Sequence, residues 1–210
     1  MNLTSPDFAD GDPIPGDLAF CIPDTTSHAT FGGNRSPALA WNDIPEGTAS
    51  LALICVDPDA PSVGDDVNQE GREVPADLPR ADFYHWVLVD LPADTDRLEQ
   101  GEFSDGVTSR GKDTAAGPRA TRQGRNDYTG WFEGDAGMAG TYLGYDGPCP
   151  PWNDSIPHRY VFTLYALDQA TCDIDGDFTG PEVLAAVEGH VLGQASLTGT
   201  YTLNPRLQAG

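Results

Sequence analysis

The segment that decides the fold and the candidate site is Gly147-Pro-Cys-Pro-Pro151, followed by His158-Arg-Tyr160 and the run Val161-Phe-Thr-Leu-Tyr-Ala-Leu167. Proline fixes φ near about −65°, so the first part is predicted to be a rigid loop. The later run alternates as a strand does, which places His158 and Tyr160 on one face and Arg159 on the other. An imidazole and a phenol at the start of a strand supply hydrogen-bond donors. This arrangement favours an oxyanion as ligand.

A second group of polar residues follows two other predicted strands. The run Ser50–Val56 is apolar and of strand length, and it ends in Asp57-Pro-Asp-Ala-Pro61. The run Phe83–Leu91 is also strand-like and carries His85 near its start. Two histidines and the carboxylates of Asp57 and Asp59 are therefore predicted at strand ends.

Taken together, these motifs resemble the phosphatidylethanolamine-binding protein family, in particular its prokaryotic Raf kinase inhibitor-like branch. The resemblance spans roughly residues 15 to 203 and includes three further segments, Gly33–Trp41, Gly189–Leu192 and Gly199–Tyr201. It implies a ligand site for phosphate-like headgroups, whose matching positions here are Asp57, His85, Pro151, His158 and Tyr160. Asp59 and Gly147 are expected to shape that site and belong to the same set of candidate binding residues.

The carboxylates beside an anion site have more than one interpretation. A carboxylate bonded to an imidazole orients the ring and favours its charged form, which then binds phosphate by charge-assisted hydrogen bonds. Asp59 could instead cap the turn before Pro61, or pair with Arg159 behind the pocket. The segment Asp57–Pro61 alone would be typical of a simple turn, because Asp and Pro are favoured there.

The predicted fold is mainly β. We expect a single domain over residues 1–210, in which a large antiparallel sheet packs on a smaller sheet with one or two peripheral helices near the C-terminus. The main helix is predicted over Pro181–His190, with Pro at its first position, and a short one over Asp94–Gln100. Two polar inserts, about residues 62–82 and 104–139, are predicted to be loops beside the pocket.

Composition points to a high-salt environment. The formal net charge is −22, 25 of the 33 acidic residues are Asp, and Lys112 is the single lysine beside ten arginines. At molar salt the Debye length falls to about 3 Å, so such a surface is screened, whereas at low salt it would repel itself. We expect a halophilic protein, and no nucleic-acid partner, because no basic stripe is present to neutralise phosphates.

The four cysteines, Cys21, Cys55, Cys149 and Cys172, contain no Cys-x-x-Cys pair, so no zinc site is predicted. A chain of this length can bury a sizeable core without disulfides. Cys55 is expected to be a buried apolar residue, and Cys149 to be reactive if it is exposed. With no export signal and no transmembrane run, we expect a cytoplasmic protein without a cofactor.

Two functions from different classes stay open. The first is non-enzymatic binding of a phosphate-type anion or a phosphorylated partner, as the resemblance implies, with a kinase or protease inhibitor-like role. The second is a hydrolase in which His85, His158 and Asp57 or Asp59 form a two-His, one-carboxylate site. No nucleophile motif such as Gly-x-Ser-x-Gly is present, which argues against the enzyme. Prokaryotic relatives often form dimers, although no segment of this sequence indicates an interface.

Overall fold

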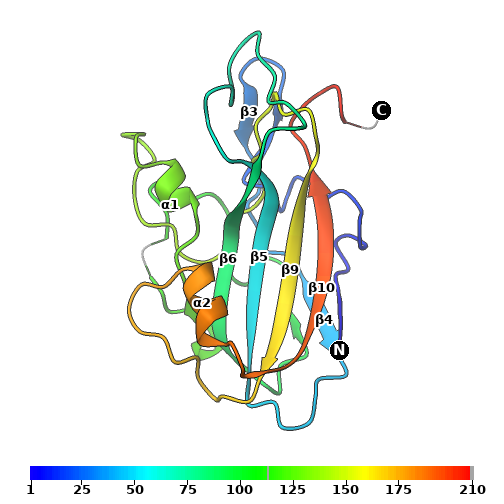
Figure 1. The fold of residues 1–210 in the computed structure, drawn as a ribbon, viewed down its shortest axis with the longest axis vertical. Coiled ribbons are helices and arrows are strands. Elements are labelled where there is room, and N and C mark those ends of the chain that lie inside the picture. Colours follow the sequence, from blue (N-terminus) through cyan, green and yellow to red (C-terminus); the bar gives the residue numbers. More distant parts are fainter. Residues whose placement is uncertain (113, 209–210) are drawn as a thin grey trace.

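A computed structural model describes residues 1–112 and 114–208 and shows a mainly β protein. The largest sheet is antiparallel, with its five strands in the order β10-β9-β5-β6-β8 (Figure 1). Its strands are β5 (Ser50–Pro61), β6 (Arg80–Pro92), β8 (Arg122–Gln123), β9 (His158–Leu167) and β10 (Val191–Tyr201). The expectation of one large antiparallel sheet is confirmed.

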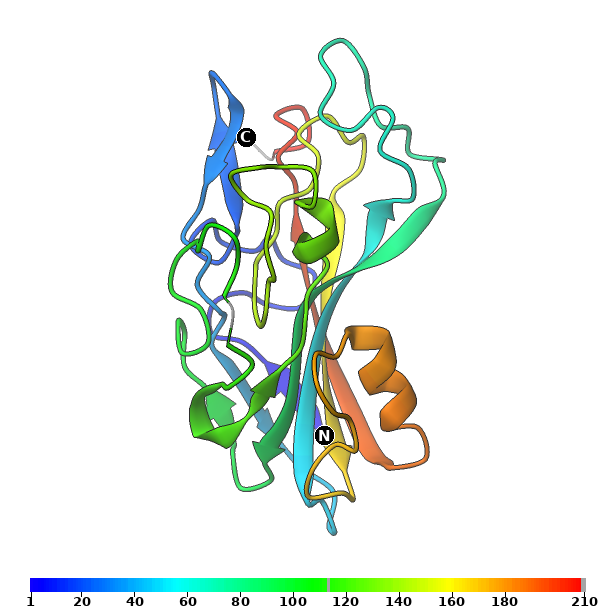
Figure 2. The same cartoon turned by 90° about the vertical axis from the view of Figure 1, so that its left-hand side faces the viewer.

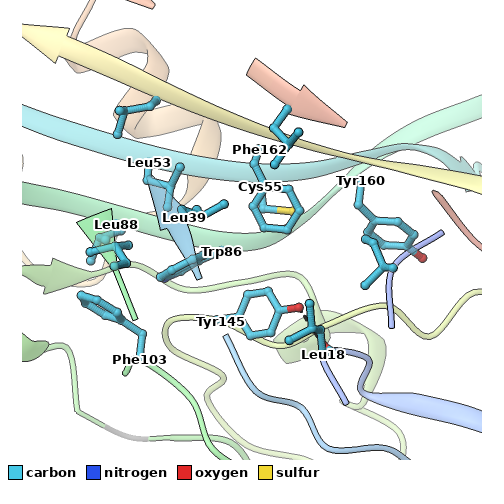
Figure 3. Close-up of a cluster of buried hydrophobic side chains, with 14 of the residues drawn as sticks. Leu18, Leu39, Leu53, Cys55, Trp86, Leu88, Phe103, Tyr145, Tyr160 and Phe162 are labelled. Carbon is cyan, nitrogen blue, oxygen red and sulfur yellow. Dashed lines mark hydrogen bonds between the residues drawn. The ribbon is translucent and has the colours of Figure 1, made fainter. Parts of the chain in front are cut away.

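The central strands are buried on both faces, which explains their continuous apolar runs. Leu53, Trp86 and Phe162 point to one face and belong to the larger hydrophobic cluster (Figure 3). Ala52 and Val87 belong to a second cluster on the other face. In β9 the alternation is as predicted. A sheet covered on both faces holds its strand ends rigidly, and those ends carry the candidate site.

Two smaller sheets lie on the side of the larger cluster (Figure 2). The first contains β1 (Asn2–Thr4), β4 (Leu39–Asn42) and β7 (Arg97–Leu98), and the second is the hairpin of β2 (Cys21–Asp24) and β3 (His28–Phe31). Leu39 and Leu98 pair across β4 and β7, and both are buried. The predicted helix over Asp94–Gln100 is therefore wrong. Its one apolar residue, Leu98, gives no helical stripe and is buried as part of a strand.

The opposite face of the large sheet is covered by helix α2 (Gly180–Ala186) (Figures 1 and 2). Val183 and Val187 pack into the second cluster. Thr179 and Glu182 form a capping box at the start of α2, which satisfies backbone N–H groups there. The helix is shorter than the predicted Pro181–His190, because the chain turns after Ala186 to enter β10.

The two inserts are mainly loops, as predicted, but each also contains regular structure. Residues 80–82 already belong to β6. The second insert includes a 3-10 turn, η1 (Pro118–Ala120), the edge strand β8 and one helical turn, α1 (Tyr128–Trp131). Helix α1 therefore lies in the middle of the chain rather than near the C-terminus.

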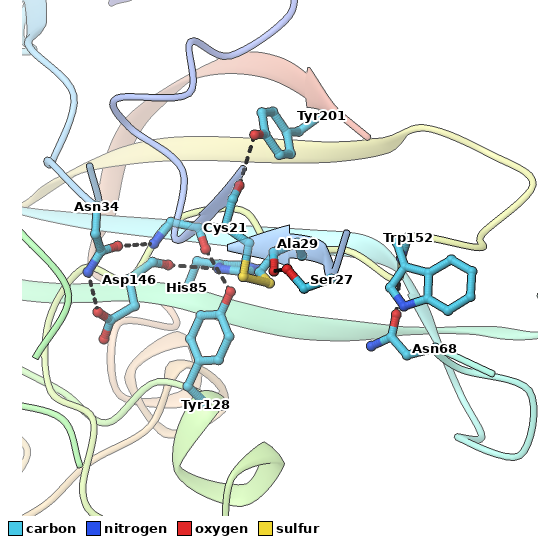
Figure 4. Close-up of a disulfide and its surroundings, with 12 residues drawn as sticks. Cys21, Ser27, Ala29, Asn34, Asn68, His85, Tyr128, Asp146, Trp152 and Tyr201 are labelled. Atoms are coloured by element: carbon cyan, nitrogen blue, oxygen red, sulfur yellow. Dashed lines mark hydrogen bonds between the residues drawn. A yellow bond between two sulfur atoms is a disulfide. The ribbon is translucent and has the colours of Figure 1, made fainter. Parts of the chain in front are cut away.

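A disulfide joins Cys21, at the start of β2, to Cys149 in the proline-rich loop (Figure 4). Cys55 and Cys172 are free and buried. The two linked cysteines are 128 residues apart, so the sequence alone offered no spacing that paired them. No helix among the described residues is long and apolar enough to cross a membrane.

Candidate functional site

The antiparallel pairing of three strands assembles the candidate site. The chain leaves β5 at the same end of the sheet where it enters β6 and β9, because neighbouring strands run in opposite directions. Asp57 pairs with Phe83 on β6, and the preceding Val56 pairs with Val161 on β9. The polar residues that follow or begin these strands are thus brought together from positions about 100 residues apart in the chain.

A pocket of about 150 Å³ lies at this end of the sheet. Five of the seven candidate residues line it, namely Asp57, His85, Pro151, His158 and Tyr160. The first insert closes one side through residues that include Val63 and Asn68. Phe83, Tyr128 and Trp131 add aromatic side chains to the lining, and the rings of Phe83 and Tyr128 are in contact. The pocket thus combines a few polar groups with apolar walls.

Asp59 does not line the pocket. Its carboxylate accepts hydrogen bonds from the backbone N–H of Arg159 at 2.9 Å and from the guanidinium of the same residue at 2.8 Å. Burial alone would raise the pKa of Asp59, but the hydrogen bonds and charge of Arg159 lower it below its usual value. Of the roles considered for Asp59, pairing with Arg159 behind the pocket is the one the structure has.

Gly147 also lies outside the pocket lining. A Cβ at this position would collide with the backbone oxygen of Leu18. The Gly147 N–H donates to the side-chain oxygen of Asn34 at 2.8 Å, and its carbonyl accepts from the Tyr128 hydroxyl at 2.7 Å. Gly147 therefore fixes the loop that carries Pro151 rather than contacting the cavity.

Both ring nitrogens of His158 are bonded to carboxylates. Nδ1 lies 2.7 Å from Asp57 and Nε2 lies 3.1 Å from Asp154, whose own carboxylate is held by Arg80 at 2.6 Å. Burial alone would lower the pKa of His158, but the hydrogen bonds and charges of Asp154 and Asp57 raise it to about 9. His158 is therefore a buried imidazolium with a hydrogen on each ring nitrogen. It lies between the carboxylates of Asp57 and Asp154, and Asp154 is in turn paired with Arg80.

His85 reaches the pocket through a β-bulge. Cys55 pairs with Trp86 and Val56 pairs with Tyr84, so His85 is the extra residue on β6. A bulge re-aims a side chain, and here it turns His85 toward the same side as Trp86 instead of the opposite side.

The residue that holds His85 in place is Asp146. His85 Nδ1 donates to the backbone oxygen of Asp146 at 2.8 Å, and the Asp146 N–H donates back to the His85 carbonyl at 3.0 Å (Figure 4). The Asp146 carboxylate is buried against Lys112, Asn34 and Asn126. Burial lowers the pKa of His85, although the charge of Asp57 acts in the opposite direction.

Three residues that organise the site were not predicted from the sequence: Asp146, Asp154 and Arg80. Asp154 stands four residues before His158, a spacing that carries no signal in a loop. Arg80 lies at the end of a polar insert, where its long-range partner is not visible in the sequence. Asp146 directly precedes Gly147, and its closeness to the proline-rich motif was the one signal available for it.

The rim of the pocket is tied together by side chains from three segments. Asn153 donates to the backbone oxygens of Asp66, Gln69 and Arg72, and accepts from the N–H of Asn68. The rings of His28 and Trp152 stack with their centroids 3.9 Å apart. Figure 4 shows Trp152 beside Asn68, which accepts its backbone N–H at 3.1 Å.

Cys149 lines the pocket, but as half of the disulfide with Cys21. It therefore has no free thiol in this structure, and the reactivity considered for it requires prior reduction. Trp131 lines the pocket and is 52% exposed, whereas Trp152 is not part of the lining and stacks on His28.

Comparison with known proteins relates the whole chain to one family. A family model described as phosphatidylethanolamine-binding protein matches residues 4–202. The UPF0098 protein YbhB of Escherichia coli is 35% identical over 202 residues, which cover 96% of this chain and 100% of that protein. A UPF0098 protein of Methanothermobacter thermautotrophicus is 36% identical, with 96% and 98% covered.

Solved structures agree with the sequence comparisons. The crystal structure of Escherichia coli YbcL, described as a new member of the mammalian PEBP family, matches with a TM-score of 0.67 at 27% identity, covering 96% of this chain and 97% of that chain. The structure of the homologue CT736 from Chlamydia trachomatis matches with a TM-score of 0.63 at 28% identity, covering 95% of each chain.

Proposed function

This chain belongs to the phosphatidylethanolamine-binding protein family, in the prokaryotic branch of YbhB and YbcL, and we propose that its pocket binds a phosphate-type anion without chemical turnover. The ligand is either a small phosphate-bearing molecule or a phosphorylated group on a protein partner. In the second case the protein acts as a regulator of the kinase or protease inhibitor-like kind.

The observation that carries this proposal is a pair of polar groups, on two residues that line the pocket, that lack a protein partner. The Tyr160 hydroxyl is buried without any hydrogen bond to the described residues, and Nε2 of His85 has no partner among them either. Both residues line the same pocket. A buried hydroxyl without a partner costs about 1–3 kcal/mol, so a ligand oxygen that accepts from Tyr160 would recover that energy.

The size and walls of the pocket support a small headgroup. A volume of about 150 Å³ is below the usual range of about 300–1,000 Å³ for ligand cavities, which favours a headgroup over acyl chains. The exposed side chains of Val63 and Trp131 at its mouth provide apolar contact for the group that carries the phosphate. Such a rim fits a ligand that continues out of the pocket.

The hydrolase alternative has one observation in its favour, the 2.7 Å contact between Asp57 and His158, which is a pairing used in acid–base catalysis. However, His158 would have to give up a carboxylate partner to ligate a metal or to accept a proton. Among the described residues, no group of three His, Cys, Asp or Glu side chains is arranged to hold a metal ion. Turnover of a chromogenic phosphate or acyl ester that disappears in His158→Ala would favour the enzyme over the binding protein.

Calorimetric titration in molar potassium chloride tests the proposal, with phosphoethanolamine, phosphotyrosine and inorganic phosphate as ligands. The informative variant is Tyr160→Phe, which removes only the unpartnered hydroxyl. The matched control is Tyr165→Phe on the same strand, because Tyr165 packs against the second cluster on the other face of the sheet.

We expect saturable binding of at least one ligand, weakened about tenfold or more by Tyr160→Phe and unchanged by Tyr165→Phe. Absence of binding by all three ligands would contradict the proposal. Equal affinity in wild type and Tyr160→Phe would remove Tyr160 from the binding site.

A further inference from the structure

The proposed anion pocket has no lysine or arginine among the described residues of its lining to receive a negative charge. The charged groups in the lining are the Asp57 carboxylate and the His158 imidazolium, which are bonded to each other. An anion therefore meets a local pair whose charges offset each other.

His158 has no hydrogen to offer to a ligand. Its two N–H groups donate to Asp57 and Asp154, and both acceptors are buried carboxylates that would lose a partner if the ring turned. Leaving a buried carboxylate without its hydrogen bond is costly. His158 thus acts as a fixed structural cation.

His85, in contrast, has one ring nitrogen without a hydrogen-bond partner among the described residues. Its Nδ1 lies 2.8 Å from a backbone carbonyl, which can only accept, so Nδ1 carries the hydrogen. In the neutral ring Nε2 is then an acceptor, and no described residue donates to it. The ring is enclosed by Phe83, Tyr128 and Tyr160, with centroids 4.9 to 5.4 Å away.

The charged and titratable groups around His85 come from each element packed against it. β5 contributes Asp57, β9 contributes His158 and Tyr160, α1 contributes Tyr128, and the loop before the proline-rich motif contributes Asp146. Asp57 is paired with His158, and Asp146 is paired with Lys112 at 3.0 Å. Each charge near His85 already has a partner, so no cation is left over for a fully ionised anion.

We propose that the pocket takes up its anion together with one proton, which lies between a ligand oxygen and Nε2 of His85. This inference rests on the proposed function. A singly ionised phosphate monoester supplies that proton from its own P–O–H group, which donates to Nε2, while another phosphate oxygen accepts from Tyr160. A doubly ionised monoester binds only when one proton is taken from solvent. The favoured ligand class is therefore the phosphate monoester monoanion.

Two small probes test this with matched shape and charge. Phenyl phosphate near its second pKa of about 6 offers a P–O–H donor, whereas phenyl sulfate carries one negative charge and no donor. Both are titrated calorimetrically into the whole protein in molar potassium chloride at about pH 5.5 and at about pH 7.5. At the higher pH the titration is repeated in buffers of different ionisation enthalpy, which counts the protons taken up.

We expect phenyl phosphate to bind at least tenfold more tightly than phenyl sulfate at the lower pH. At the higher pH we expect uptake of about one proton per ligand, with affinity falling by up to tenfold per pH unit. In His85→Gln the preference for phosphate and the proton uptake should be lost. His190→Gln, which removes an exposed imidazole bonded to Asp168, should keep both.

Binding of phenyl phosphate without proton uptake and without preference over phenyl sulfate would overturn this inference while leaving the anion-binding function intact. Absence of binding by both probes at both pH values would overturn the proposed function and the inference with it. The proton count is measured on the wild-type protein, so the result does not depend on whether His85→Gln folds.

Discussion

The two histidines of the pocket differ in how many of their ring nitrogens are hydrogen-bonded to the protein. His158 is bonded on both sides, whereas His85 is bonded on one side only. The same residue type therefore serves as a fixed cation in one case and as an open acceptor in the other. The number of carboxylates in reach of each ring decides between these states, because carboxylates stabilise the charged imidazolium.

The raised pKa of His158 predicts that the fold loses stability at alkaline pH. A group whose pKa is higher in the folded protein stabilises the fold fully below its unfolded value, about 6.5, and loses that contribution as pH rises through about 9. We expect the free energy of unfolding to fall by on the order of 3 kcal/mol across this window. Denaturant unfolding at constant molar salt measures it.

The variant His158→Gln provides the control for this prediction. It removes the titrating ring and leaves an uncharged group that hydrogen-bonds, so the slope assigned to His158 should disappear even though the variant is less stable throughout. An identical pH dependence in wild type and His158→Gln would assign the slope to other groups.

Substitution of Gly147 should destabilise the loop that carries Pro151 into the pocket. In Gly147→Ala the added Cβ meets the Leu18 backbone oxygen, which cannot move aside as a side-chain tip could. We expect a loss of about 2 kcal/mol or more in unfolding free energy. Gly64→Ala is the matched control, because Gly64 lines the pocket but has open space at its Cβ position. Its stability should stay within about 0.5 kcal/mol of wild type.

At the scale of elements, the long strands could be predicted from the sequence and their irregularities could not. The apolar runs of β5 and β6 and the alternation of β9 have strand length and strand period, so these strands could be predicted. The bulge that aims His85 follows from the pairing of β6 with β5, which leaves no local mark in Phe83–Leu91. A strict alternation would have placed His85 and Trp86 on opposite faces.

The candidate site could be predicted in part for the same reason. Residues carried by recognisable motifs, such as Asp57 and His158, do line the pocket. Their buried partners, such as Asp154 and Asp146, lie in irregular loops, and only the folding of the chain brings them close to the motif residues. Loop residues that act only through tertiary contacts have no periodic signal to reveal them.

The insert over residues 62–79 should depend on Asn153 for its order. The two N–H hydrogens of one side-chain amide are shared among three backbone carbonyls of this loop, and a hydrogen bond of this kind contributes roughly 1 kcal/mol. We expect Asn153→Ala to speed amide hydrogen exchange in the loop by tenfold or more and to weaken ligand binding.

The exposed Asn42 on β4 supplies the control, since Asn42→Ala should leave exchange in the loop unchanged. Unaltered protection of residues 62–79 in Asn153→Ala would show that the packing of the loop, rather than Asn153, holds it.

For the whole molecule, the net charge of −22 predicts a fold that depends on salt. Removing salt lengthens the screening distance from about 3 Å at molar concentration to about 30 Å at 0.01 M, so repulsion among the acidic residues then acts across the whole surface. We expect the β-sheet circular dichroism signal to be lost during dialysis from molar potassium chloride to low salt.

Dialysis from potassium chloride into sodium chloride of equal ionic strength is the control and should leave the spectrum unchanged. A spectrum that persists at low salt would contradict the halophilic interpretation.

The bond between Cys21 and Cys149 makes most of the chain a covalent ring. Both long inserts lie inside that ring, together with exposed trypsin sites at Arg72 and Arg110. A single cut in either insert opens the ring without releasing a fragment. The nicked protein should therefore run as one band on a non-reducing gel and separate into two pieces only after a thiol is added, so proteolytic damage to the pocket rim escapes any assay that omits the reductant.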